Sequence, residues 1–74
     1  MKFSIYKKYD ATVYDEDDMF IMNAFNLHFS NKADALMWGR RQAKKNGRTF
    51  GHISISDQET SKIVRYKANG KSWD

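Results

Sequence analysis

Apolar side chains recur at every second position in two neighbouring stretches of the chain, residues 3–13 and residues 19–29. A period of two is typical of a β-strand with one buried face. If Phe3 lies opposite Phe29 and Val13 lies opposite Met19, one register pairs apolar side chains with apolar side chains nearly throughout. We therefore expect a β-hairpin at the start of the chain.

The connection between these two strands, residues 14–18, is rich in carboxylates and reads YDEDD. Successive like charges repel one another and are well solvated, which favours an exposed turn. Carboxylate oxygens are also ligands for Mg²⁺ or Ca²⁺, but this loop has neither the glycine nor the distal glutamate of a calcium-binding loop. We expect a solubilising turn, or a contact with basic residues of a partner, and no metal site.

A helical period replaces the period of two after Phe29. Asn31, followed by Asp34 three residues later, is a variant of the capping box that begins helices, and Asn46 with Gly47 supplies a stop. The pattern predicts a helix over Lys32–Lys45. Small residues spaced by four on one side of this helix allow it to lie close against a sheet; they are Ala35, Gly39 and Ala43.

The opposite side of the predicted helix is basic. Cations fall within an arc of about 140° at about 100° per residue; they are Arg40, Arg41, Lys44 and Lys45. Asp34 is the only acidic residue between Lys32 and Arg48. Because a merely solvated helix face more often includes glutamate, this asymmetry favours a negatively charged partner, either phosphates or an acidic protein surface.

Two further stretches of strand character follow the helix, and a turn-rich segment, residues 57–61, separates them. The predicted order is strand, strand, helix, strand, strand. This is an α+β fold, a four-stranded antiparallel sheet with one helix packed on one face, and only the strand orders 2-1-3-4 and 1-2-4-3 keep all neighbours antiparallel. We expect residues 1–74 to form a single domain, with residues 69–74 as a tail that is flexible or folds back through Trp73.

The third strand contains RTFGHISIS, which shares Arg48, Phe50 and Gly51 with the base-stacking strand of the RNA recognition motif. Three informative positions differ and the element order differs, so we do not assign this family. Phe50 and His52 are two residues apart, so they are expected to share the open face of the sheet with Arg48, where they could stack a single-stranded base. The alternative is that Phe50 completes the core edge and His52 is an ordinary surface residue.

The sheet face away from the helix is expected to expose more apolar and aromatic surface than a monomer usually shows to water. We place Tyr6, Phe20 and Met22 on this face, and these residue types are enriched in protein interfaces. A tail folded over the face is the competing explanation. A homodimer that pairs its open sheet faces is a further possibility that is compatible with other partners.

The sequence lacks the chemistry of an enzyme. His28 and His52 are isolated on different strands, and there is no cysteine nucleophile, no G-x-S-x-G motif, no P-loop and no paired-carboxylate helix. We expect neither catalytic residues nor a cofactor. The absence of cysteine suits a reducing compartment, and no stretch approaches the ~18 apolar residues of a membrane span, so we expect a cytoplasmic protein without membrane contact.

These features predict a small non-enzymatic binding protein that docks on a protein or nucleoprotein complex. Such cysteine-free single domains are common among phage and mobile-element inhibitors, including anti-CRISPR proteins, and a basic helix can compete for a nucleic-acid channel or meet an acidic patch. The alternative function is direct binding of single-stranded nucleic acid. The residues predicted to contact the partner are Arg40, Arg41, Lys44, Lys45, Arg48, Phe50, His52, Tyr6, Phe20 and Met22.

Overall fold

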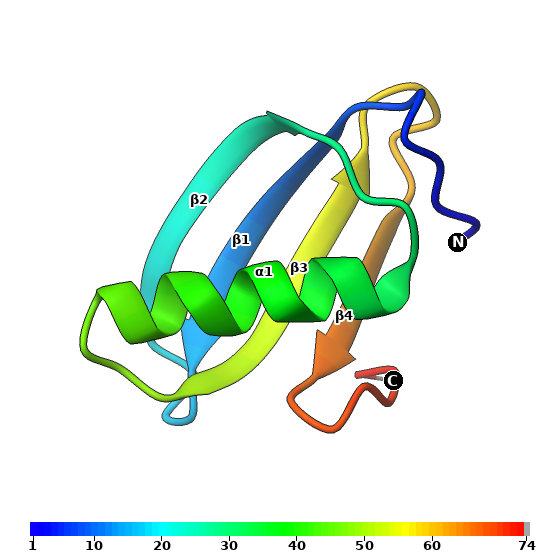
Figure 1. Ribbon diagram of the computed structural model, residues 1–74. Helices are drawn as coiled ribbons and strands as arrows, with labels where there is room; N and C mark the ends of the chain where they lie inside the picture. Colours follow the sequence, from blue (N-terminus) through cyan, green and yellow to red (C-terminus); the bar gives the residue numbers. More distant parts are fainter. Residues whose placement is uncertain (74) are drawn as a thin grey trace.

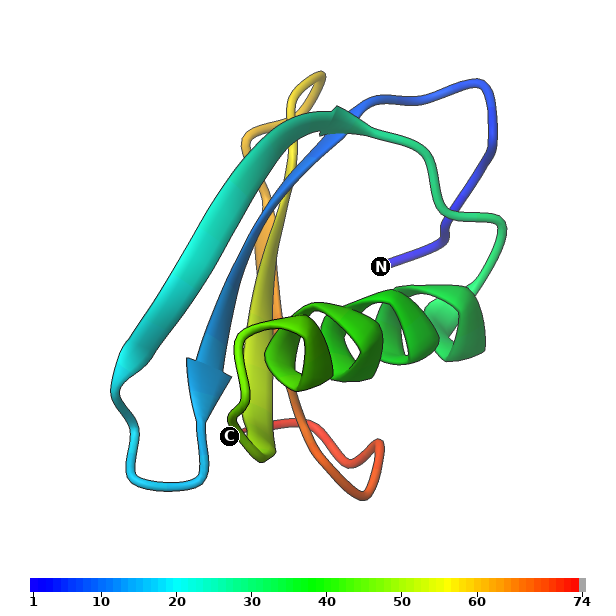
Figure 2. The same ribbon diagram turned by 60° about the vertical axis from the view of Figure 1, so that its left-hand side comes forward.

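Four strands form one antiparallel sheet in the computed structural model, which describes residues 1–73. The elements are β1 (Tyr9–Asp15), β2 (Phe20–Leu27), α1 (Lys32–Lys45), β3 (Phe50–Asp57) and β4 (Ile63–Lys67). Their order in the sheet is β2-β1-β3-β4, one of the two predicted orders, and α1 crosses one face of the sheet (Figure 1). Within residues 1–73 the opposite face carries no helix (Figure 2). The predicted α+β class and antiparallel sheet are confirmed.

Both ends of α1 follow the capping pattern in the sequence. Asn31 Oδ1 accepts a hydrogen bond from the Asp34 amide at 2.8 Å, and Asp34 Oδ2 accepts one from the Ser30 amide at 3.1 Å. The helix ends at Asn46, and the chain turns at Gly47, whose φ of 68° suits a residue without a Cβ. α1 begins on the β4 side of the sheet and ends on the β2 side (Figure 1).

The core lies between α1 and the inner face of the sheet. The helix lies closest to the sheet at Gly39, which faces the ring of Phe50. A Cβ at this position would lie 2.9 Å from Cε1 of Phe50, so any other residue would require the ring to shift. Ala35 and Ala43, the other small residues of this side, are also buried, which confirms the predicted packing face. The largest fully buried side chains come from the two central strands; they are Tyr9, Val13, Ile53 and Ile55.

The first strand is shorter than the sequence predicts. β1 begins at Tyr9 and not at Phe3, because the preceding residues turn back on themselves. The Lys7 amide donates to the Ser4 carbonyl oxygen at 3.1 Å, and the Ser4 amide donates to the Tyr9 hydroxyl at 2.9 Å. Phe3 then packs its ring against Tyr9 and Phe29, with centroids 5.3 and 6.3 Å apart. The apolar character of this segment therefore reflects a core contact and not a strand.

The register of the first hairpin also differs from the prediction. Val13 lies opposite Met22 rather than Met19, and Tyr9 lies opposite Leu27. The pairing shifts near each end of β2, and at each shift β2 contains one residue more than β1. An extra residue moves the following side chains to the other face. Met22 consequently lies on the inner face and packs against the core, although the period of two assigned it to the open face.

A bulge at Gly51 in β3 separates the faces of Phe50 and His52. Tyr14 lies opposite His52, but the next residue, Asp15, lies opposite Phe50, so Gly51 is an extra residue. A Cβ on Gly51 would lie 2.0 Å from the carbonyl oxygen of Asp15. Phe50 turns into the core and is 8% exposed, whereas His52 stays on the open face. The expectation that both side chains share the open face is wrong, because the bulge interrupts the period of two. The alternative reading is right for Phe50, which completes the core edge, and wrong for His52, which is 7% exposed and not an ordinary surface residue.

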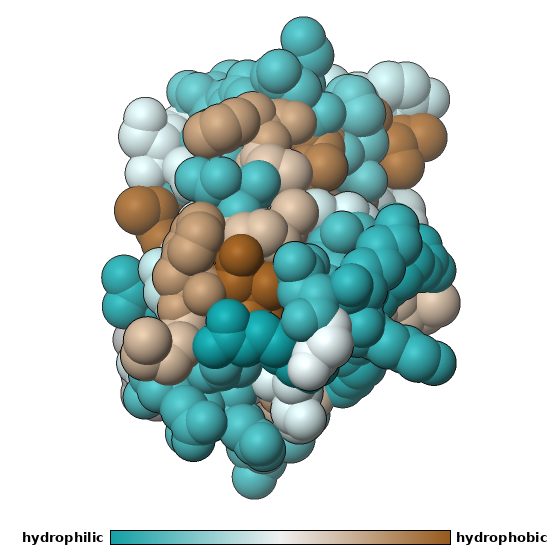
Figure 3. All heavy atoms as spheres, turned by 90° about the vertical axis from the view of Figure 1, so that its left-hand side faces the viewer, coloured by the Kyte–Doolittle hydropathy of each residue, from teal (hydrophilic) through white to brown (hydrophobic). Residues whose placement is uncertain are grey.

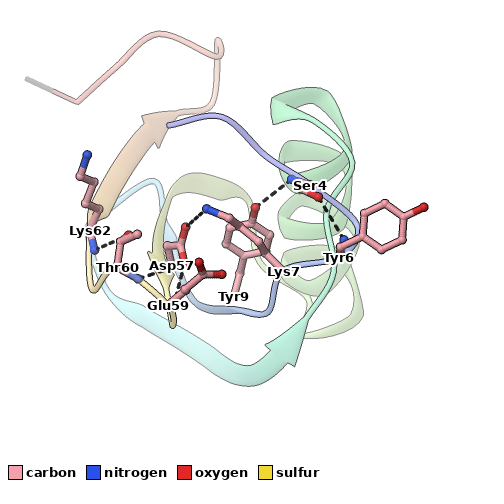
Figure 4. A network of polar contacts seen from close by, with 8 residues as sticks. All are labelled: Ser4, Tyr6, Lys7, Tyr9, Asp57, Glu59, Thr60 and Lys62. Atoms are coloured by element: carbon pink, nitrogen blue, oxygen red, sulfur yellow. Dashed lines mark hydrogen bonds and ion pairs between the residues drawn. The ribbon is translucent and has the colours of Figure 1, made fainter.

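An ion pair at the other end of the sheet fixes the turn between β3 and β4 (Figure 4). Asp57 is 2% exposed and accepts hydrogen bonds from Lys7 Nζ at 3.1 Å and from the amides of Glu59 and Thr60 at 2.9 and 3.4 Å. Burial pushes the pKa of Asp57 upward, but these hydrogen bonds outweigh it, and the pKa lies below its ordinary value. The pair anchors the segment before β1 to the end of β3.

Candidate functional site

The outer side of α1 carries exposed cations, as the helical period predicts. Among residues 1–73, Arg41, Lys44 and Lys45 make no ion pair, and we call these three residues the basic helix face. Arg40 is used differently, because its Nη2 donates to the carbonyl oxygen of Ala68 in the turn after β4. The helix dipole favours cations at the last turn, but it does not account for the absence of acidic side chains beside them.

Arg48 belongs to the acidic loop between β1 and β2 and not to the basic helix face. Its guanidinium pairs with Oδ2 of Asp15, which is 5% exposed. Oδ1 of Asp15 accepts hydrogen bonds from the amides of Asp17 and Met19, each at 2.9 Å. The Met19 amide is the largest cause of the lowered pKa of Asp15; burial opposes it, and Arg48 adds to it. Arg48 thus helps to close this loop.

The outer strand β2 exposes apolar side chains along the edge of the sheet. Met19, Phe20 and Phe25 are 58%, 55% and 63% exposed, and residues 19–27 include no ionisable side chain. Figure 3 faces this edge and shows an apolar area across its middle, bordered by hydrophilic atoms on the helix side. The period of two predicts that Met19 and Phe25 are buried, which is wrong, whereas Phe20 is exposed as predicted. The uncharged run itself was the available signal, because edge strands normally carry charges.

On the open face, the imidazole of His52 lies between two aromatic rings. Tyr14 of β1 stacks on it with 4.4 Å between ring centroids, and Trp73 lies over it from the β4 side at 4.2 Å. Trp73 reaches this position because the chain turns back after β4 and the Trp73 amide donates to the Arg65 carbonyl oxygen at 2.9 Å. The tail therefore covers part of the open face through residue 73, and Asp74 lies outside the described residues.

The environment of His52 favours a neutral ring. Burial lowers the pKa of His52, the Asp18 carboxylate opposes this, and Arg65 lowers it further. Nδ1 of His52 is buried and finds no hydrogen-bond partner among the described residues, with Asp18 Oδ1 3.5 Å away. Because Tyr14 and Trp73 already contact the ring, His52 is not free to stack on a base in this conformation.

Tyr6 lies apart from the other residues predicted to contact a partner. It is 91% exposed in the turn before β1, and its ring points away from the ion pair of Asp57 (Figure 4). The structure therefore does not bring the predicted residues together on one surface. The basic helix face forms one group. The remaining predicted residues are distributed over the turn after β4, the core, the acidic loop, the open face and the β2 edge.

The acidic loop does not assemble a metal site in the part of the chain that the structure describes. Within residues 1–73, no group of three or more His, Cys, Asp and Glu side chains is placed to hold a metal ion.

No helix in this range is both long and apolar enough to cross a membrane. Comparison of the chain with protein-family models, with curated proteins and with solved structures gives no match.

Proposed function

We propose that this protein is a non-enzymatic binding module whose basic helix face docks on an acidic surface of a protein partner. The supporting observation is that Arg41, Lys44 and Lys45 lie together on one exposed side of α1 without a carboxylate partner among residues 1–73. Their spacing of three and four makes them neighbours on the helix surface. Uncompensated charge of one sign attracts a complementary surface and accelerates its association.

Direct binding of single-stranded nucleic acid is the second candidate and has weaker support. Such binding combines a cationic groove with aromatic rings that are free to stack on bases. Here His52 already stacks on Tyr14 and contacts the tilted ring of Trp73, and Phe50 lies in the core. Phosphate contacts through the basic helix face alone would give an affinity that falls steeply with salt.

A phage or mobile-element inhibitor, such as an anti-CRISPR protein, is the specific kind of binding module that we expect from the sequence. In a nucleoprotein complex, the basic helix face would meet either an acidic patch of the protein component or the phosphates of the nucleic acid.

Charge reversal of the basic helix face tests this proposal. One variant changes Arg41, Lys44 and Lys45 to Glu, and a matched variant changes Lys62, Lys67 and Lys71 to Glu; all of these side chains are exposed. Both variants and the wild type are used to capture proteins from a lysate, with and without nuclease treatment. We expect the helix variant alone to lose the captured protein, with an affinity at least about tenfold weaker, because like charges then face each other.

The outcome separates the two candidate functions. Capture of the same protein by all three chains would contradict docking through the basic helix face. Loss of capture after nuclease treatment, together with salt-sensitive binding of a single-stranded oligonucleotide, would favour the nucleic-acid function instead. Circular dichroism spectra of the three chains show whether the substitutions leave the fold intact.

A further inference from the structure

The two edge strands of the sheet, β2 and β4, differ in how far they are shielded from pairing with a further strand. The returning tail covers the outer edge of β4 at Arg65 and Tyr66, through a bridge between Tyr66 and Ser72 and a hydrogen bond from the Trp73 amide to Arg65 O at 2.9 Å. The outer edge of β2 has no neighbouring strand among the described residues. β4 also carries cations, whereas residues 19–27 carry no charge. Among residues 1–73, the β2 edge is therefore the edge that has neither a covering segment nor a charged side chain.

A free apolar edge is a template for another strand. Natural sheets block such edges with lysine, proline, β-bulges, inward-pointing charges or a covering segment. Residues 19–27 contain neither charged side chains nor proline, and the bulges of β2 lie on either side of residues 22–24. These three residues therefore pair regularly with β1. The straight part of the edge is thus centred on Asn23, a side chain that is exposed.

The two ends of β2 carry opposite charges. The acidic loop, with Glu16, Asp17 and Asp18 exposed, precedes the strand. One cationic side chain, Lys8, lies exposed at the other end, beside His28, whose Nδ1 is 2.8 Å from the Lys7 carbonyl oxygen. An antiparallel copy of β2 would bring the acidic end of one chain to the basic end of the other.

We propose that β2 pairs antiparallel with β2 of a second copy of this chain, centred on Asn23. In this arrangement Met19 of one copy lies opposite Leu27 of the other, and the acidic loop of one copy lies toward Lys8 of the other. The two-fold symmetry makes each charge contact twice. Because the β4 edge is covered, the assembly closes at two copies instead of growing into a filament.

The arrangement has a geometric consequence for α1. Antiparallel pairing of identical edges places the two-fold axis perpendicular to the sheet, so both helices lie on the same face of one continuous sheet. α1 ends on the β2 side (Figure 1), so the basic helix faces of both copies lie toward the shared centre. The dimer is inferred from the sheet edges and from the charges at the two ends of β2, and it does not depend on the proposed function.

The molecular mass in solution tests the dimer directly. Sedimentation equilibrium of the full chain from about 5 to about 500 µM should give twice the chain mass of 8.7 kDa at the upper concentrations. Asn23→Lys places two ammonium groups opposite each other at the centre and should weaken the dimer at least about tenfold. Ile63→Lys, a control on the β4 edge where Ile63 is 61% exposed, should leave the dimer intact.

A charge exchange tests the register. Lys8→Glu should weaken the dimer, because it puts a carboxylate beside the acidic loop of the other copy, and adding Asp17→Lys in the same chain should restore it. Far-UV circular dichroism verifies that each variant is folded. A wild type that stays monomeric over the whole concentration range overturns the proposal, and so does a dimer that Asn23→Lys does not weaken. Failure of the second substitution to restore the dimer overturns the register centred on Asn23.

Discussion

At the scale of single residues, buried carboxylates hold the turns of this small fold. Asp15 closes the loop between β1 and β2, and Asp57 closes the turn between β3 and β4; each accepts two backbone amides. Each also pairs with one cation, Arg48 or Lys7. In both cases the hydrogen bonds favour the charged form more than burial disfavours it, so the pKa of each carboxyl is lowered.

Changing Asp57 to Asn should lower stability near neutral pH and reduce the loss of stability in acid. The folded pKa lies below the ordinary value of 3.8, so folding favours the ionised carboxylate. This contribution is present above the ordinary pKa and is lost as the pH falls through the lowered folded pKa. Urea unfolding between about pH 6 and about pH 2 should therefore show a smaller decline for the variant than for the wild type.

The exposed carboxylate of Asp17 provides the matched control for this measurement. Asp17→Asn removes the same charge but leaves the contacts of Asp57 with Lys7, Glu59 and Thr60 in place, so its acid decline should follow the wild type. An Asp57→Asn variant with the decline of the wild type would contradict a stabilising role of the ion pair in Figure 4.

At the scale of elements, the sequence predicts which elements form better than it predicts their faces. The helix bounds Lys32–Lys45 follow from local capping residues, and antiparallel pairing leaves only two strand orders, of which β2-β1-β3-β4 is observed. Extra residues in β2 and at Gly51 in β3 then interrupt the period of two. These bulges depend on contacts between strands, which a single sequence pattern does not contain. Met22 and Phe50 therefore lie on the face opposite to the predicted one.

In the candidate site, too, features set by neighbouring residues could be predicted, whereas contacts between residues distant in the sequence could not. The period of a helix gives the angular position of each residue directly, so the exposure of Arg41, Lys44 and Lys45 could be predicted. The role of Arg48 could not, because its partner Asp15 is 33 residues away in the sequence. The position of Trp73 over His52 likewise depends on how the tail returns along β4.

Gly51→Ala should destabilise the protein by about 1–3 kcal/mol, because the added Cβ has no space and the bulge must shift. The contact is with the backbone oxygen of Asp15, at 2.0 Å from the Cβ position, and this atom cannot rotate away. Ser54→Ala in the same strand is the control and should change stability by less than about 0.5 kcal/mol. Chemical denaturation compares the two, and equal stabilities would show that the bulge does not require glycine.

At the scale of the whole molecule, charge and apolar surface are segregated. The net charge is +4, with free cations on the outer side of α1, carboxylates in the loop before β2, and apolar side chains along the β2 edge. The open face of the sheet is partly covered by the tail through Trp73. This distribution favours two separate contacts: the basic helix face for an acidic partner, and the β2 edge for a second copy of the chain.

The most direct test of the proposed function is a map of the amide signals of the ¹⁵N-labelled chain during titration with the protein recovered by capture. Docking through the basic helix face predicts that the largest changes fall on residues 40–46, at the end of α1, and that added salt reduces them because the contact is electrostatic. Changes confined to residues 62–73, with the amides of α1 unaffected, would contradict the account.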